Sequence, residues 1–101
     1  MSLVDKEMTI PDFLQSTYLL LVQSFPNGIS DEYYWAILYL LYDYVADENL
    51  AIVMSRFAGK SWAMVTNDLY GICQMKFDPR LLDEVREKLD ANGFKEWKKE
   101  T

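Results

Sequence analysis

The sequence predicts an all-α fold, a compact bundle of about five short helices around a central, aromatic-rich helix at residues 30–45. Three observations predict it. Apolar side chains recur every three or four residues along most of the chain, which is the period of an amphipathic helix. Half of the 101 residues are hydrophobic and only four are glycine, so the chain can form one buried core. Residues 30–45 are apolar on two neighbouring faces, which is typical of a helix inside a bundle.

The central helix is predicted to begin at Ser30, a favoured N-cap residue that two acids follow. Its first apolar face consists of Tyr34, Ile37, Leu38, Leu41 and Val45. Its second apolar face consists of Trp35, Tyr39 and Tyr42. Because one narrow core stripe cannot accommodate both faces, the second face is either covered by other helices or left for a partner.

Two further helices are predicted on either side of the central one. The first follows a cap at Thr9 and ends near Ser24, since Pro26 disfavours helical geometry at the residue before it. The third is predicted to begin at an Asp47 N-cap and to end at Gly59. Its buried face is Leu50, Val53, Met54 and Phe57.

The last two helices also have clear start and stop residues. Ser61 is expected to cap the fourth, and Gly71 to end it. Its apolar stripe is Trp62, Val65, Leu69 and Ile72. Asp78 and Pro79 are predicted to start the fifth, which closes at Asn92-Gly93. We therefore expect a single helical domain at residues 9–94, with flexible termini at residues 1–8 and 95–101.

Composition narrows the function classes. Histidine is absent, which excludes Ser-His-Asp and Cys-His nucleophilic systems and every histidine metal site. Asp43 and Asp47 form an i,i+4 acid pair, but they fall across a predicted helix end, where capping and solvation explain them. No apolar run is long enough to span a membrane, and Cys73 has no partner for an internal disulfide. We expect a cytoplasmic, non-enzymatic protein with no cofactor, metal or small-molecule ligand.

Two motifs have tempting spacing. Gly59-Lys60-Ser61 resembles the end of a phosphate-binding loop, but Met54 occupies the position where that loop needs its first glycine. The predicted helices across residues 48–70, joined by a short turn, have the form of a helix-turn-helix, in which Lys60 and Asn67 would contact nucleic acid. Residues 1–54 carry one base and eight acids, so the chain has few of the Lys and Arg side chains that binding to nucleic acid requires.

The aromatic surplus is the best indication of function. Tyr and Trp are enriched where proteins meet, because they bury a large area with few rotatable bonds. The sequence thus predicts a module for protein interaction or self-association, whose partner-binding residues are Trp35, Tyr39 and Tyr42. The partner is a protein or a second copy of the chain. A nucleic-acid-binding regulator that uses residues 48–70 is the alternative.

Four segments carry a family resemblance. They are Phe25-Pro26-Asn27-Gly28-Ile29, Asp47-Glu48-Asn49-Leu50-Ala51, Asn67-Asp68-Leu69-Tyr70, and a last segment that runs from Asp78-Pro79 to Val85-Arg86-Glu87-Lys88-Leu89 and closes in Asn92-Gly93-Phe94. The chain resembles, from about Phe13 to Phe94, the small bacterial family catalogued as domain of unknown function 3349. It departs from that family in having Lys95 where a proline is expected. The resemblance implies a compact all-helical domain and implies no activity.

Overall fold

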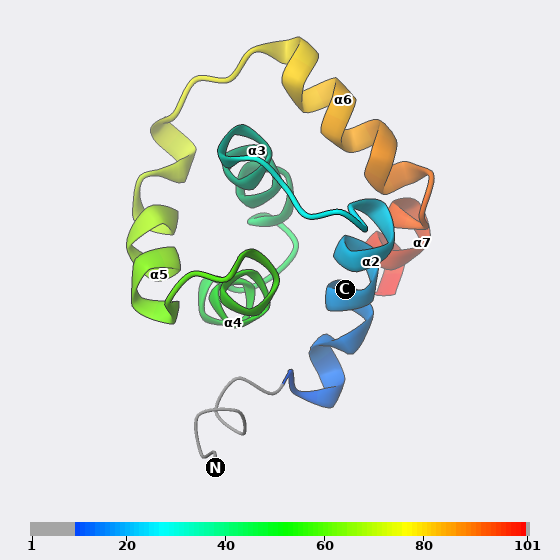
Figure 1. Cartoon of the computed structure of the whole chain (residues 1–101), viewed down its shortest axis with the longest axis horizontal. Helices are drawn as coiled ribbons and strands as arrows, with labels where there is room; N and C mark the ends of the chain where they lie inside the picture. Colours follow the sequence, from blue (N-terminus) through cyan, green and yellow to red (C-terminus); the bar gives the residue numbers. More distant parts are fainter. Residues whose placement is uncertain (1–9, 101) are drawn as a thin grey trace.

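The computed structural model of the chain describes residues 10–100. In this range it contains six α-helices, two short 3-10 helices and no strand. In chain order the elements are η1 (Asp12–Leu14), α2 (Gln15–Ser24), α3 (Asp31–Leu41), α4 (Asp47–Ala58), α5 (Trp62–Tyr70), η2 (Ile72–Gln74), α6 (Pro79–Asp90) and α7 (Phe94–Glu100). The predicted all-α fold is confirmed (Figure 1).

Three helices begin at the predicted caps. The Ser30 hydroxyl accepts a hydrogen bond from the backbone N–H of Tyr33 at 3.2 Å. The Ser61 hydroxyl accepts one from the N–H of Met64 at 3.1 Å. Before α6, the Asp78 carboxylate accepts one from the N–H of Arg80 at 3.0 Å. Each cap satisfies a donor that the first helical turn leaves unpaired.

The start of α4 differs from the prediction. Ala46, not Asp47, occupies the N-cap position, and no side chain caps this end of the helix. Asp47 is the first helical residue, where its negative charge still suits the helix dipole. At the other end the prediction is confirmed, because Gly59 has a left-handed φ of 72° and closes the helix.

The limits of the first two helices also need correction. A 3-10 turn precedes α2, which ends at Ser24 as expected, whereas the predicted cap Thr9 lies outside the described residues. The central helix α3 ends at Leu41 instead of Val45. Residues 42–44 form a turn, yet Val45 stays buried and its N–H still bonds the Leu41 carbonyl at 3.1 Å.

Helix α3 is the centre of the bundle. It packs against α6 on one side and against α4 on another, while α2 contacts α4, α6 and α7 (Figure 1). Five of its side chains are at most 1% exposed, namely Tyr34, Ala36, Ile37, Leu38 and Leu41. The first predicted apolar face of the central helix is thus the core of the fold.

The C-terminal segment is the largest departure from the prediction. Residues 95–100, expected to be flexible, belong to α7, which begins at Phe94. Phe94 and Trp97 are buried, and their rings stack with centroids 5.7 Å apart. The Trp97 indole N–H donates to the Thr17 hydroxyl on α2 at 2.9 Å. The helix forms because Trp97 docks on α2 and stacks on Phe94, one turn before it.

Candidate interaction surface

Of the three aromatic residues predicted to bind a partner, Trp35 and Tyr39 lie on the second face of α3, and Tyr42 follows directly after the helix as its C-cap. All three are half-buried. Tyr39 packs against Phe77, in the connector before α6, with ring centroids 4.8 Å apart. Tyr42 lies 6.0 Å from Tyr39, and Trp35 packs edge-on against Tyr34 at 5.4 Å. Their own chain therefore covers part of each ring. Their contact with a partner stays a prediction.

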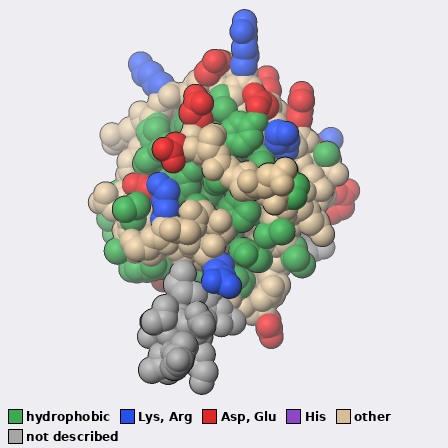
Figure 2. All heavy atoms as spheres, in the orientation of Figure 1, with side chains coloured by type: hydrophobic (Ala, Val, Ile, Leu, Met, Phe, Trp, Pro, Cys, Tyr) green, Lys and Arg blue, Asp and Glu red, His purple; other side chains and the backbone are tan. Residues whose placement is uncertain are grey.

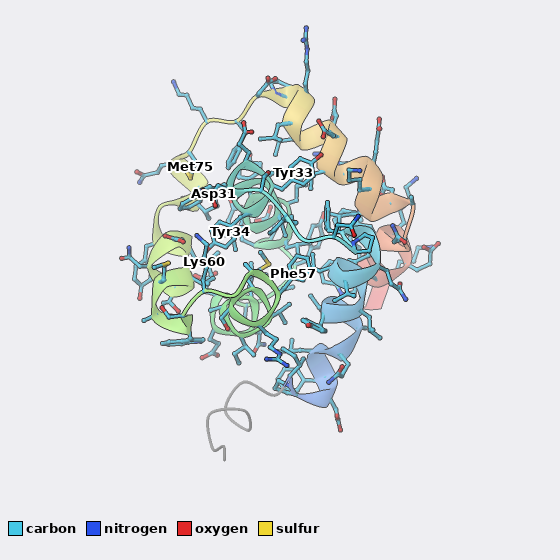
Figure 3. All side chains as sticks on the ribbon, in the orientation of Figure 1. Asp31, Tyr33, Tyr34, Phe57, Lys60 and Met75 are labelled. Carbon is cyan, nitrogen blue, oxygen red and sulfur yellow. The ribbon has the colours of Figure 1, made fainter. Side chains whose placement is uncertain are left out.

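Two adjacent tyrosines on α3 tie this helix to opposite neighbours. Figure 3 shows Tyr33 directed toward α6 and Tyr34 directed toward the side of α4 and α5. The Tyr33 hydroxyl donates to the Glu84 carboxylate on α6. The Tyr34 hydroxyl donates to the Asp68 carboxylate on α5 at 2.6 Å. The first of these bonds joins residues that are 51 positions apart in the sequence, and the second joins residues that are 34 positions apart. Both start from the same turn of α3.

Lys60 completes the cluster around Tyr34. Its ammonium lies 4.1 Å from the centroid of the Tyr34 ring, a cation–π geometry (Figure 3). Burial, followed by the hydrogen bond to Asp68 and the charge of Asp68, raises the pKa of the Tyr34 phenol above its ordinary value of 10.0. The phenol is therefore neutral at physiological pH and acts as a donor rather than as a base. This cluster links α3 to α5.

Apolar side chains also gather at the middle of the face shown in Figure 2, with many charged side chains around its edge. In the same orientation, Tyr34, Phe57 and Lys60 are labelled near the middle of the view in Figure 3. Phe57 is half-buried and packs edge-on against Tyr18 of α2 at 6.5 Å. Phe57 packs against Tyr18, and Tyr34 packs against Lys60, so these rings form the edge of the core.

Helix α5 carries two strongly exposed aromatic side chains. Trp62 is 49% exposed and Tyr70 is 72% exposed. Thr66 lies between them in the sequence, and its hydroxyl donates to the Trp62 carbonyl at 2.9 Å. These residues are four positions apart, so they follow one side of the helix. The prediction that Trp62 belongs to the buried stripe is wrong, whereas Val65, Leu69 and Ile72 are buried as predicted.

This side of α5 borders an open groove of about 480 Å³, which we call the α5 groove. It is lined by Trp62, Thr66 and Tyr70 from α5 and by Ala46, Asp47 and Glu48 from the start of α4. Asp47 and Glu48 are exposed. Along residues 10–99 the only salt bridge joins Arg86 to Asp83, so neither groove carboxylate has a cationic partner there. The groove combines exposed aromatic rings with unpaired negative charge.

Helices α4 and α5 form the short corner that the helix-turn-helix alternative requires. Their exposed residues suit nucleic acid poorly, because residues 61–75 contain no Lys or Arg. Asn67 is exposed, as that alternative needs, whereas the Lys60 ammonium lies over the Tyr34 ring. The corner therefore offers aromatic and acidic groups where a nucleic-acid reader offers basic ones.

Residues 10–100 contain no group of three or more potential metal ligands. Cys73 is exposed. None of the helices in this range combines the length and the apolar character that crossing a membrane demands.

Comparison with known proteins gives no further assignment. Protein-family models, curated proteins and solved structures each gave no match to this chain. The resemblance to domain of unknown function 3349 therefore stays a prediction.

Proposed function

We propose that this chain is a non-enzymatic protein-interaction module, and that the α5 groove is its main binding surface. The observation that carries the proposal is the exposure of Trp62 and Tyr70 on the same side of one short helix. Large aromatic rings dominate the energy of protein interfaces, because they bury much apolar area at low entropic cost. The core does not require these two rings, since Val65 and Leu69 provide the buried side of α5.

The second face of α3 is proposed as a secondary contributor. Trp35, Tyr39 and Tyr42 are each half-buried, so a partner would gain less area from them than from Trp62 or Tyr70. We further propose that the protein works in the cytoplasm, because the lone Cys73 suits a compartment that keeps thiols reduced. Nucleic-acid binding through residues 48–70 ranks below protein binding, because residues 61–75 contain no Lys or Arg that could pair with phosphates.

The proposal is tested by site-specific photo-crosslinking in the native cell. A benzophenone amino acid placed at Thr66 samples the groove, and the same group placed at Phe13 provides the control. Phe13 is 70% exposed, and it lies on η1 rather than on α5. We expect cross-linked species above the mass of the single chain from position 66, and their loss when Trp62 and Tyr70 are changed to Ala.

Two further results complete the test. Sedimentation of the purified chain across micromolar concentrations separates a homodimer from a heterologous complex. Cross-links that are equally abundant from positions 13 and 66, or that persist after the Trp62 and Tyr70 changes, would show that the groove is not the binding surface. A Trp35→Ala variant measured in parallel reports the share of the second face of α3.

A further inference from the structure

We propose that the occupant of the α5 groove is a cationic amphipathic helix of another protein. This inference rests on the proposed function and adds the chemistry of the partner. Two properties of the groove carry it, namely the charge at its rim and the spacing of its aromatic rings.

The rim of the groove is negative. Asp47 and Glu48 are exposed carboxylates, and none of the described residues that line the groove is Lys or Arg. The sequence also has no Lys or Arg from residue 7 to residue 55 or from residue 61 to residue 75, and these stretches include both walls. Lys or Arg side chains on a partner would find unpaired acids there, and the field of these acids would speed the encounter.

The same charges disfavour a second copy of this chain as the occupant. A symmetric dimer brings the same surface of each copy together, so a dimer built on the groove would gather four unpaired carboxylates at one interface. Like charges facing each other across an interface cost free energy, and each copy already carries a net charge of −6. Anionic lipid surfaces and nucleic acids are repelled for the same reason.

The aromatic rings define the shape of the partner. Trp62 and Tyr70 are eight residues apart on one helix, which places them about 12 Å apart along its axis. A partner helix presents apolar anchors at the same interval when they are seven or eight residues apart. Between the two rings, the Thr66 hydroxyl already donates to a backbone carbonyl, so no free hydroxyl donor must be desolvated there. The wall between the rings is thus compatible with an apolar side chain.

The test uses the full chain and two synthetic peptides of about 18 residues, long enough to form a helix on binding. One peptide carries Leu and Phe on one face and Lys on the other. Its twin has every Lys replaced by Glu. Tryptophan fluorescence and calorimetry measure binding. We expect the Lys peptide to bind with a dissociation constant of roughly micromolar order, because the groove is smaller than a standard interface. We expect the Glu twin to bind at least tenfold more weakly.

Matched variants locate the site. Trp62→Ala and Tyr70→Ala should each weaken binding of the Lys peptide by about tenfold or more. The double change Asp47→Asn, Glu48→Gln should weaken it by about three- to tenfold and reduce its salt dependence. Its control is Asp31→Asn, Glu32→Gln, the same pair of acids in the first turn of α3, which should change binding by less than about twofold.

Two outcomes would overturn the inference. Equal binding of the Lys and Glu peptides would show that charge plays no role. Equal effects of the double change in α4 and the control double change in α3 would show that the peptide does not bind at the α5 groove. If the Lys peptide fails to bind while cross-linking from position 66 still depends on Trp62 and Tyr70, the cationic partner is wrong and the interaction module stands. If that dependence is absent, the proposed function itself fails.

Discussion

Removing one hydroxyl group tests the link between the central helix and α5. In Tyr34→Phe the ring stays in the core and under Lys60, while the hydrogen bond to Asp68 is lost. This bond is 2.6 Å long and charge-assisted, and the Tyr34 side chain is 1% exposed. Hydrogen bonds to charged groups contribute about 1.5–3 kcal/mol, and partial access of water to Asp68 favours the lower end. We expect the free energy of unfolding to fall by about 1.5 kcal/mol.

Chemical and thermal denaturation measure this loss. For a domain of this size, 1.5 kcal/mol corresponds to a fall in Tm of roughly 6–12 °C. A double-mutant cycle with Asp68→Ala isolates the pair, and we expect a coupling energy of about 1 kcal/mol. If Tyr34→Phe changes stability by less than about 0.5 kcal/mol, the hydroxyl does not hold α5 to α3 and the reasoning is refuted.

The same bond gives a dependence on alkaline pH. Burial and Asp68 raise the pKa of Tyr34 in the folded chain, whereas the unfolded phenol loses its proton near pH 10.0. Above that pH the unfolded state binds fewer protons than the folded state, so stability must fall as pH rises. Tyr34→Phe should make this fall shallower. A residual slope is expected from Tyr42, whose pKa is also raised by partial burial and by the charge of Asp43. Identical slopes in the two proteins would contradict the assignment.

The remaining stability predictions concern the docking of α7 and the start of α4. Trp97→Ala should lower the free energy of unfolding by about 3–5 kcal/mol in urea denaturation, because a buried ring that stacks on Phe94 is lost; an unchanged midpoint would mean that α7 does not dock. Ala46→Ser should raise stability by about 0.5–1 kcal/mol, because α4 lacks a side-chain cap and Ala46 already has an extended ψ of 146°. A fall in Tm for this variant would show that a hydroxyl cannot reach the first turn.

The parts of the fold that the sequence predicts well depend on local chemistry. Ser30 and Ser61 cap helices because a hydroxyl at those positions pairs with an N–H three residues later. Gly59 ends α4 because a residue without Cβ adopts φ of 72° at little cost. Pro26 stops α2 through a clash with the residue before it. None of these effects needs the rest of the molecule.

The parts that were predicted wrongly depend on tertiary packing. Residues 62, 66 and 70 form one stripe of α5 and residues 65 and 69 form another, and sequence spacing alone does not say which stripe faces the core. The structure buries the second stripe. Similarly, α7 is rich in charge, and it is Trp97 bonded to Thr17, 80 positions away, that holds it on α2. Such long-range contacts leave little trace in local periodicity.

The same distinction separates a binding surface from a structural one on α5. If Trp62 and Tyr70 served the fold, replacing them would cost as much as replacing a core residue, about 2–5 kcal/mol each. Both rings are largely exposed, so we expect Trp62→Gln and Tyr70→Gln to change the free energy of unfolding by less than about 0.5 kcal/mol each. Val65→Ala, on the buried side of the same helix, is the matched control and should cost more than about 1 kcal/mol. Loss of cross-linking from Thr66 without loss of stability would then assign the two rings to recognition, whereas a large loss of stability in the Gln variants would return them to the core and leave the α5 groove without its anchors.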